Sequence, residues 1–229
     1  MTGVSDNAKG SAGLVMVQAP RSAAAEAYRS LSTNIQFSSL DKDVKTLLVT
    51  SVAPDEGKSI VLANLAVTMA ENGRKIIVVD CDLRRPSLHT VFGLKDGPGL
   101  TSMVLDETLA PPLQQTSIAN VSLVAAGPPP PNPSELLASA RFGRALAAIV
   151  EQGDVIVLDA APVTAVTDAS ILATRVDGVL LVVDSGRTRR DPARRAKEQL
   201  ERVGARLLGV VLTNVKPEKG QSQYLSVAK

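Results

Sequence analysis

The stretch Ser51-Val-Ala-Pro-Asp-Glu-Gly-Lys58-Ser59 decides the fold, because an apolar run enters it and a helical pattern leaves it. The run is Thr46-Leu-Leu-Val-Thr-Ser51, and the helical pattern extends from Ile60 to Asn72. A strand, a glycine-containing turn and a helix in this order form a phosphate cradle, since backbone N–H groups and a helix N-terminus present partial positive charge. In such a cradle Lys58 would reach the β and γ phosphates of a nucleotide, and the Ser59 hydroxyl would ligate Mg²⁺.

The phosphate-binding pattern is only partly met, because Val52 stands where its first glycine usually lies. Taken alone, Gly-Lys-Ser could be the solvated start of a helix. Two further segments favour the nucleotide site, because each is an apolar run that ends in carboxylates: Arg74-Lys-Ile-Ile-Val-Val-Asp80-Cys-Asp82 and Asp154-Val-Ile-Val-Leu-Asp159. Such runs are typical of strands buried on both faces of a parallel sheet, where ligands bind beyond the carboxyl ends. We therefore expect Lys58, Asp80, Asp82 and Asp159 to meet at one sheet edge.

Strand and helix patterns alternate along the chain. Strands are predicted at 46–52, 76–80, 121–125, 155–159, 178–183 and 207–213, and helices at 22–37, 59–72, 134–151, 168–175 and 191–203. Ser134 is predicted to cap the helix that follows the proline-rich connection 128–133. Alternation of this kind predicts right-handed crossovers. The predicted fold class is α/β and P-loop NTPase-like, with a mostly parallel central sheet and helices on both faces.

Composition limits the function classes. With 229 residues, 45% of them hydrophobic, the chain is long enough to bury a substantial core. A net charge of +2 and five aromatic side chains, none of them Trp, argue against nucleic acid as a partner. Cys81 is the only cysteine, which excludes an intrachain disulfide, and we expect it to line the core. His89 is the only histidine, which excludes a metal site built on histidines.

The sequence predicts a cytoplasmic protein. Its longest apolar runs, such as Val179-Leu-Leu-Val-Val183, fall far short of the ~20 residues that a spanning helix needs. Residues 1–20 lack the apolar core of a signal peptide. Any association with the inner face of the cell membrane would then depend on a partner. We expect a flexible arm over 1–19, one folded domain over 20–217 and a flexible tail over 218–229.

An arginine-rich segment begins after the predicted strand 178–183. It contains Arg187-Thr-Arg-Arg190 together with Arg194, Arg195 and Lys197. These side chains could form the solvated face of a helix, or they could form a contact surface for an acidic neighbour. The sequence leaves both readings open.

With these residues in view, the chain from about Pro20 to Pro217 resembles the bacterial tyrosine kinases of capsule and exopolysaccharide export. The Gly-Lys-Ser loop is similar to the family's Walker A motif, and Val155-Ile-Val-Leu-Asp-Ala-Ala-Pro162 to its Walker B motif. Val79-Asp-Cys-Asp-Leu-Arg-Arg-Pro-Ser-Leu-His89 resembles its specific Asp-x-Asp segment. Two further segments are also similar: Asn132-Pro-Ser-Glu-Leu-Leu137, which follows Gly127, and Val166-Thr-Asp-Ala-Ser-Ile-Leu172.

The resemblance implies an ATP-dependent protein-tyrosine autokinase that regulates polysaccharide polymerisation and export, with a kinase domain over 20–217. It implies phosphorylation between copies in a ring, activation by the cytoplasmic tail of a membrane adaptor (a polysaccharide co-polymerase), and downstream polysaccharide enzymes as further partners. Mg²⁺ would be held by Ser59, Asp82 and Asp159, with Lys58 on the phosphates. Asp80 is our candidate base for the tyrosine proton, although Asp80 and Asp82 could exchange roles. The nucleotide would contact Ala53, Pro54, Asp55, Glu56, Gly57, Lys58, Ser59, Ile60 and, at adenine, Asn214, although Asn214 could instead be only a turn residue.

The chain departs from the family pattern in three ways. Asp55 occupies a loop position that glycine often fills, which adds negative charge near the phosphates. Ser32 replaces the last arginine of the ring-forming segment Glu26-Ala-Tyr-Arg29-Ser-Leu-Ser32, and a serine cannot provide a bidentate donor, so a ring would be weakened. In place of a terminal tyrosine cluster the chain has only Tyr28 and Tyr224, of which Tyr224 is the predicted phosphoacceptor and Tyr28 a structural residue.

Two alternatives remain open. One is a regulatory ATPase that is not a kinase, like septum-positioning and partition ATPases, but those relatives carry an early loop lysine where this chain has Ala53. The other is a nucleotide-binding pseudokinase that serves as a scaffold of the same export machinery, which the lack of a tyrosine cluster favours.

Overall fold

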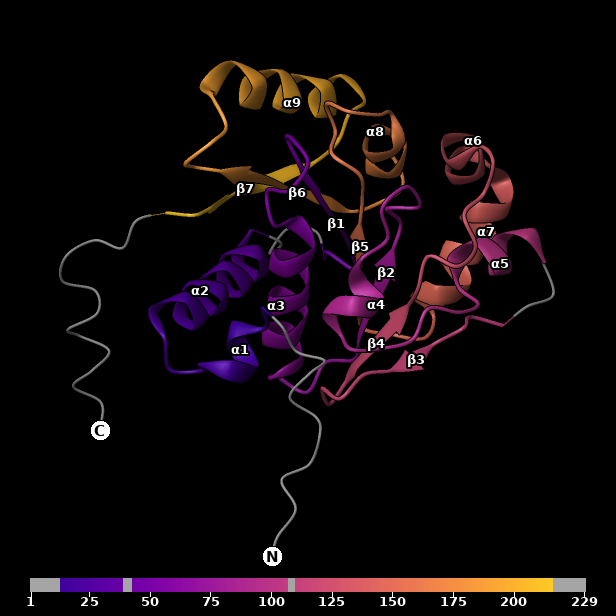
Figure 1. Cartoon of the computed structure of the whole chain (residues 1–229), viewed down its shortest axis with the longest axis horizontal. Helices are drawn as coiled ribbons and strands as arrows, with labels where there is room; N and C mark the ends of the chain where they lie inside the picture. Colours follow the sequence, from indigo (N-terminus) through magenta and orange to yellow (C-terminus); the bar gives the residue numbers. More distant parts are fainter. Residues whose placement is uncertain (1–12, 39–42, 107–109, 216–229) are drawn as a thin grey trace, which may run out of the picture.

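The computed structural model describes residues 13–38, 43–106 and 110–215, and a seven-stranded sheet runs through its centre (Figure 1). The strand order is β3-β4-β2-β5-β1-β6-β7, and every neighbouring pair is parallel except β3 with β4. The strands are β1 Thr46–Ser51, β2 Ile76–Asp80, β3 Gln114–Gln115, β4 Val121–Val124, β5 Val155–Asp159, β6 Gly178–Asp184 and β7 Leu207–Thr213. The six predicted strands and the α/β class are confirmed, and β3 is an addition.

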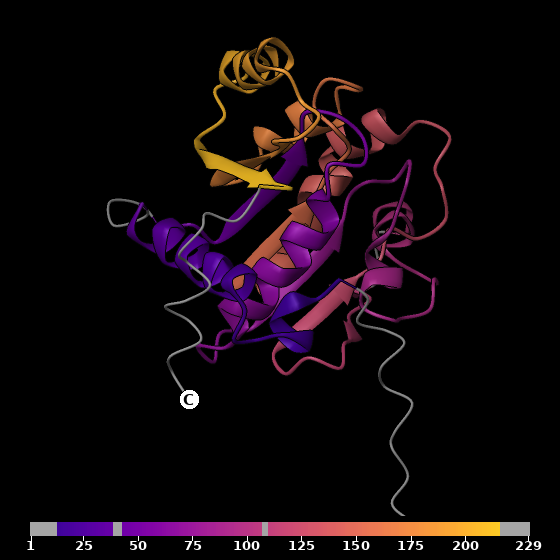
Figure 2. The same ribbon diagram turned by 60° about the vertical axis from the view of Figure 1, so that its left-hand side comes forward.

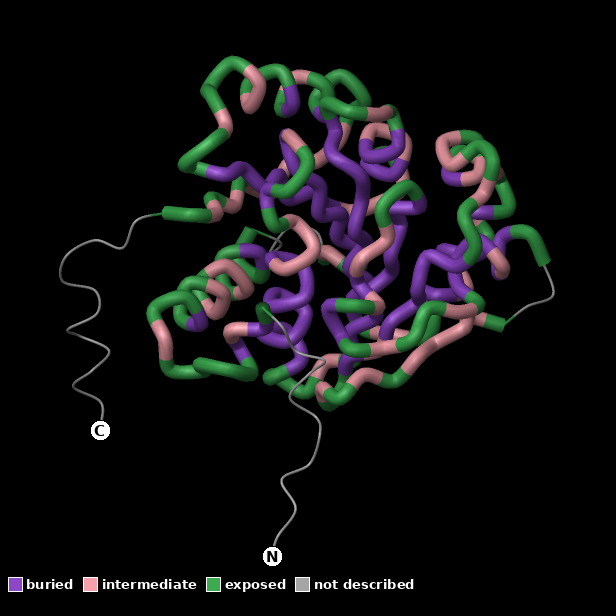
Figure 3. The backbone as a smooth tube through the Cα atoms, in the orientation of Figure 1, coloured by how far each residue is buried: buried purple, intermediate pink, exposed green. Residues whose placement is uncertain are grey.

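The central strands are buried on both faces because helices cover both. Every residue of β1, β2, β5 and β6 is buried, which explains their continuous apolar runs. Successive side chains point to opposite faces, so Leu47 and Val49 enter one core cluster and Leu48 enters the other. Figure 3 shows this buried centre.

The helices form one layer on each face of the sheet. The first layer contains α1 Val15–Gln18, α2 Ala23–Phe37, α3 Lys58–Ala70 and α4 Leu88–Val91. The second contains α5 Leu100–Leu105, α6 Pro133–Ala138, α7 Ala140–Val150, α8 Asp168–Ala173 and α9 Arg190–Arg202. Figure 2 shows α2 and α3 lying across the near face of the sheet. No helix in these described ranges is long and apolar enough to cross a membrane.

The helix predicted over 134–151 is two helices, so that prediction is wrong in its middle. Ser139 has an extended backbone (φ −65°, ψ 155°), and its side chain accepts a hydrogen bond from Phe142 N at 3.1 Å, which starts α7 as a new helix. The predicted cap at Ser134 is also wrong. Pro133 occupies the first turn of α6 and Asn132 its N-cap position, while the Ser134 hydroxyl bonds to Asp168.

A flexible arm was predicted over residues 1–19, but the part of it that the structure describes, residues 13–19, contains a short helix. It forms α1, in which Leu14 and Met16 are buried, and Met16 N donates to Asn64 Oδ1 at 3.1 Å. Two apolar side chains packed on α2 and α3 are enough to fix this short helix. Residues 1–12 and the predicted tail 218–229 lie outside the described residues.

The sheet order brings together the carboxyl ends that carry charge. β5 lies between β1 and β2, so Asp159 is the register partner of Asp80 across β5 and β2 and of Val49 in β1. The loop after β1 leads directly into α3 at Lys58. Three strand ends and one helix N-terminus therefore converge at one edge.

A substitution at Gly99 tests how closely the start of α5 packs against the chain after β4. A Cβ at Gly99 would lie 2.1 Å from the Ala125 carbonyl oxygen, which accepts a hydrogen bond from Leu100 N. We expect Gly99→Ala to lower the free energy of unfolding by at least about 2 kcal/mol in urea titrations. The matched control is Gly209→Ala in β7, where a Cβ would meet nothing within 4 Å. Equal stability of the two variants would contradict the prediction.

Candidate nucleotide-binding active site

The loop between β1 and α3 has the backbone of a phosphate cradle. Gly57 takes the N-cap position of α3 with φ 82°, and Asp55 also has a positive φ of 62°. Both values lie in the left-handed region, which glycine adopts at least cost. The positive φ of Asp55 gives a physical reason for the glycine that the family resemblance implies at this position. The side chains of Lys58 and Ser59, at the start of α3, contact Asp159 at the end of β5.

Lys58 bridges two carboxylates at the centre of the site. Its Nζ lies 2.8 Å from Asp82 Oδ2 and 3.0 Å from both carboxylate oxygens of Asp159. The Ser59 hydroxyl donates to Asp159 Oδ2 at 2.6 Å. The four residues expected to surround the metal and the phosphates thus lie in direct contact.

Burial and charge compete in the pKa values of this cluster. Burial alone lowers the pKa of Lys58, but attraction to Asp159 and Asp82 outweighs it and the pKa is raised. Burial raises the pKa of Asp159 by more than Lys58 and Ser59 lower it. The site therefore holds its carboxylates at a desolvation cost that a second cation would reduce.

Asp80 lies behind this cluster and is fully buried. Its Oδ2 accepts the backbone N–H groups of Ser87 and Leu88, each at 3.0 Å, and its Oδ1 accepts Asp82 N at 3.2 Å. Burial, and next the charge of Asp159, raise the pKa of Asp80 to about 7 in spite of these donors. A carboxyl with this pKa can exchange a proton near neutral pH, as a general base must.

The donor set fits Mg²⁺ bound together with a nucleotide. Two carboxylates and a hydroxyl already surround one cation, the Lys58 ammonium, and such oxygen atoms are the ligands that Mg²⁺ prefers. In the described ranges no three His, Cys, Asp or Glu side chains form a metal cluster by themselves. Mg²⁺ usually takes one or two carboxylates and completes its shell with phosphates and water, so this is the expected arrangement.

Glu56 has a role in the loop that the sequence did not reveal. Its buried carboxylate accepts Val52 N at 2.8 Å and Ala53 N at 3.0 Å, and it also accepts the Thr188 hydroxyl. These bonds tie the start of the cradle to the segment after β6. The sequence offered one indication of this role, a charged residue at position 56 in the turn before Gly57, and that indication does not specify which groups Glu56 would bind.

Asn214 lies beyond β7 beside the same loop. Its side-chain amide donates to the buried Asp184 Oδ2 at 2.8 Å, and the neighbouring Thr213 hydroxyl donates to the Glu56 carbonyl at 3.0 Å. Asn214 also has a positive φ of 53°. The positive φ is consistent with the turn-residue alternative, and the adenine contact that the resemblance implies stays a prediction, with the amide held by Asp184.

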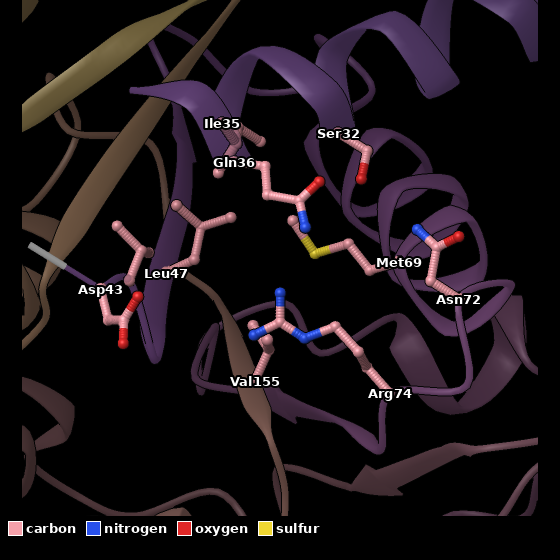
Figure 4. Close-up of a pocket in the computed structure, with 10 residues that line it drawn as sticks. Ser32, Ile35, Gln36, Asp43, Leu47, Met69, Asn72, Arg74 and Val155 are labelled. Atoms are coloured by element: carbon pink, nitrogen blue, oxygen red, sulfur yellow. The ribbon is translucent and has the colours of Figure 1, made fainter. Parts of the chain in front are cut away.

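The remaining predicted residues lie away from this edge. Ser32 lines a cavity of about 140 Å³ at the amino ends of the strands, together with residues that include Arg74, Met69 and Gln36 (Figure 4). Tyr28 packs against two core clusters, and burial raises its pKa, which fits the predicted structural role. Tyr224 lies outside the described residues.

The structure also shows the surroundings of Cys81 and of part of the arginine-rich segment. Cys81 is fully buried in the core, as predicted, and burial raises its pKa. In α9, Arg194 and Lys197 form ion pairs with acidic neighbours on the same helix. These pairs favour the solvated-face interpretation for those two residues.

Comparison with known proteins gives consistent relatives. The tyrosine-protein kinase YwqD of Bacillus subtilis is 38% identical over 212 residues, which cover 92% of this chain and 89% of that protein. The putative tyrosine-protein kinase CapB of Staphylococcus aureus is 36% identical over 206 residues, which cover 90% of this chain and 90% of that protein. The chain belongs to the bacterial tyrosine kinase family.

Solved structures of the family have the same fold. The chimerical protein CapA2B2 superposes with a TM-score of 0.85 at 35% identity, covering 90% of this chain and 91% of that one. The kinase domain of Escherichia coli tyrosine kinase ETK superposes with a TM-score of 0.82 at 28% identity, covering 90% and 83%. The match to the tyrosine-protein kinase wzc of Salmonella typhimurium covers 28% of that longer protein. Members of this family therefore occur both as short chains and within longer ones.

A family model described as ParA, NUBPL iron-transfer P-loop NTPase, matches residues 44–222. This match places the kinase among the nucleotide-binding P-loop NTPases. Iron–sulfur clusters are held by several cysteine thiolates, whereas this chain has Cys81 alone, and it is buried. The nucleotide-binding fold is shared with that family, and the cysteine count does not support cluster transfer.

Asp80 should make the nucleotide-free kinase less stable as the pH rises from about 4 to about 7. Its pKa rises from 3.8 to about 7 on folding, so folding takes up a proton in this window. The stabilisation is complete below the window and is lost as the buried carboxyl ionises. We expect the free energy of unfolding of the wild type, relative to Asp80→Asn, to fall between about pH 4.5 and about pH 7.5 in urea titrations. An unchanged difference at the two pH values would refute this.

Asp55 should weaken nucleotide binding through its charge. Its side chain is exposed, so screening limits the effect, and we expect Asp55→Asn to tighten the binding of a fluorescent ATP analogue about two- to fivefold. Asp55→Gly, which also relieves the positive φ, is the matched variant. Similar gains in both variants would identify charge as the cause, and a gain in neither would contradict the prediction.

Proposed function

We propose that the chain is an ATP-dependent protein-tyrosine autokinase that regulates capsular or exopolysaccharide polymerisation and export. The observation that carries the proposal is the contact of Lys58 with Asp82 and Asp159 beside the Ser59 hydroxyl. Phosphoryl transfer needs neutralisation of charge on the γ phosphate, and this cluster supplies one ammonium and the oxygen ligands for a metal ion. The names of the relatives support the choice of tyrosine as the acceptor.

The residues divide the work in the following way. The backbone of 53–60 would bind the phosphates of ATP, and Asn214 would contact adenine. Ser59, Asp82 and Asp159 would hold Mg²⁺, which when bound neutralises phosphate charge. Lys58 would move from the two carboxylates to the phosphates. Asp80 or Asp82 would accept the proton of the acceptor hydroxyl: the pKa of Asp80 is about 7, which suits proton transfer near neutral pH, but Asp80 is fully buried, whereas Asp82 lies in direct contact with Lys58.

The acceptor and the partners are part of the proposal. Tyr224 is the proposed autophosphorylation site, because Tyr28, the other tyrosine, is partly buried within α2 and packs against two core clusters. A second copy of the chain would provide the acceptor, and the cytoplasmic tail of a membrane adaptor would activate the kinase and hold it at the inner face of the membrane. Polysaccharide enzymes would be downstream substrates.

Assembly into a ring would be weakened at the first turns of α2. Ser32 has no guanidinium, and Arg29 makes contacts within its own chain, to Glu26 and to Glu71, each at 3.4 Å. These are partly exposed ion pairs of small individual energy, so they can exchange for contacts with a neighbouring copy.

A second candidate function is a nucleotide-binding pseudokinase that acts as a scaffold of the export machinery. The observation that favours it is the small number of acceptors, since the chain has two tyrosines and one of them, Tyr28, is partly buried against the core.

Radiolabel transfer separates the two candidates. Incubation with γ-labelled ATP and Mg²⁺, with the adaptor tail added, should label protein tyrosine in the wild type and in Tyr28→Phe. We expect Lys58→Met to lower labelling by at least about 100-fold, because it removes charge stabilisation of the transferred group. Tyr224→Phe should abolish autophosphorylation. No label on tyrosine in the wild type would reject the kinase in favour of the scaffold, and label that persists in Tyr224→Phe would reject the acceptor assignment.

A further inference from the structure

Arg84 forms a side-chain contact near the site that the roles above do not use. Its Nε lies 2.8 Å from Asp168 Oδ2 and its Nη2 lies 3.2 Å from Asp168 Oδ1, so the pair is bidentate. The Ser134 hydroxyl donates to Asp168 Oδ1 at 2.5 Å and accepts from Arg84 Nη2 at 3.0 Å. The Asp168 side chain is fully buried, whereas that of Arg84 is 39% exposed. The three side chains form one closed hydrogen-bonded group, the Arg84–Asp168–Ser134 latch.

The latch joins the two segments that carry the metal-site carboxylates. Arg84 follows Asp82 by two residues in the loop between β2 and α4. Asp168 is the first residue of α8 and ends the connection that begins after Asp159 in β5. The strand pairing of β2 with β5 ends with Cys81 N donating to the Asp159 carbonyl at 2.9 Å, and beyond it the latch adds a side-chain link between the two connections.

Lys58 is a second side-chain link between the same two segments. It contacts Asp82 on one connection and Asp159 at the start of the other. In the proposed kinase the Lys58 ammonium is needed at the phosphates, and both carboxylates are needed at the cation. Binding of the nucleotide with its metal therefore removes the Lys58 link and leaves the latch as the ion pair that spans the two connections.

Hydrogen bonds within the loop after β2 connect the backbone next to Arg84 with both Asp82 and Asp80. Arg85 N donates to Asp82 Oδ1 at 3.0 Å, and Asp82 N donates to Asp80 Oδ1 at 3.2 Å. Ser87 N donates to Asp80 Oδ2, and its hydroxyl donates to the Ser59 hydroxyl at 3.0 Å. A shift of the backbone at 84 would therefore reach the Asp82 and Asp80 carboxylates through the hydrogen bonds that they accept from backbone N–H groups of this loop.

We propose that Arg84 is a positioning residue that, through Asp168 and Ser134, holds Asp82 at the correct distance from Asp159 once Lys58 has moved to the nucleotide. The inference rests on the proposed function, because it assumes that metal and nucleotide bind at this cluster. The guanidinium suits the role because its planar fork matches both oxygens of one carboxylate, which a lysine ammonium cannot do.

The test measures the metal dependence of nucleotide binding rather than catalysis. Binding of a fluorescent non-hydrolysable ATP analogue is titrated with Mg²⁺ for the wild type, Arg84→Lys and Arg85→Ala. Arg85 is the matched control, because its side chain is exposed and has no hydrogen bond or ion pair within the described ranges, while its backbone N–H is kept in the variant. We expect Arg84→Lys to raise the Mg²⁺ concentration at half-saturation about tenfold, and Arg85→Ala to leave it unchanged.

A second measurement separates positioning from general stability. The melting temperature of Arg84→Lys should stay close to that of the wild type without ligand, where Lys58 still links the segments, and its increase on addition of Mg²⁺ and analogue should be smaller. If Arg84→Lys does not fold, Ser134→Ala is used, with a smaller rise in the Mg²⁺ half-saturation of about two- to threefold. An unchanged Mg²⁺ half-saturation in the folded variant, or an equal change in Arg85→Ala, overturns the proposal. A wild type that does not bind the analogue refutes the proposed function instead, and one that binds it without labelling tyrosine refutes only the kinase activity.

Discussion

The site depends on one ammonium group held between two buried carboxylates. Lys58 at the start of α3 contacts Asp82 beyond β2 and Asp159 at the end of β5, so three separate elements meet through one side chain. With Asp80 included, three carboxylates face one lysine. When all are ionised the edge carries an excess of two negative charges in a region that water hardly reaches. The raised pKa values of Asp80 and Asp159 express that excess, and binding of a cation would relieve it.

The strand order makes this concentration of charge possible. Because β5 lies between β1 and β2, the carboxyl ends of all three strands share one edge, and the loop after β1 opens over it. The strands can bring charges together there because their remaining residues are apolar and packed on both faces. The stabilisation from burying this large apolar core offsets the free-energy cost of holding like charges close together at the edge.

Departures from the family pattern occur outside this cluster. Asp55 keeps the left-handed backbone of a glycine position, Ser32 lies at the opposite end of the sheet, and the tyrosines are few. Lys58, Ser59, Asp82 and Asp159, which we propose hold the phosphates and the metal, match the family pattern, whereas Asp55 in the same loop and the residues that concern assembly and the acceptor differ. This distribution is what we expect if the chemistry is shared with the relatives and the contacts with other copies of the chain have diverged.

The sequence by itself determined the six main strands, the phosphate cradle and the carboxylates at strand ends, because periodicity and chain order are local properties. Lys58, Ser59, Asp82 and Asp159 could be expected to meet, since parallel strands end at one edge. Only the tertiary structure decided that Arg84 rather than Arg85 pairs with Asp168, a residue 84 positions away, or that Glu56 holds Val52 and Thr188. It also decided that residues 14–18 fold onto α3 and that Ser139 divides a helix. The physical reason is that a residue pattern specifies which face a side chain occupies, whereas its partner depends on which distant element the packed core brings beside it.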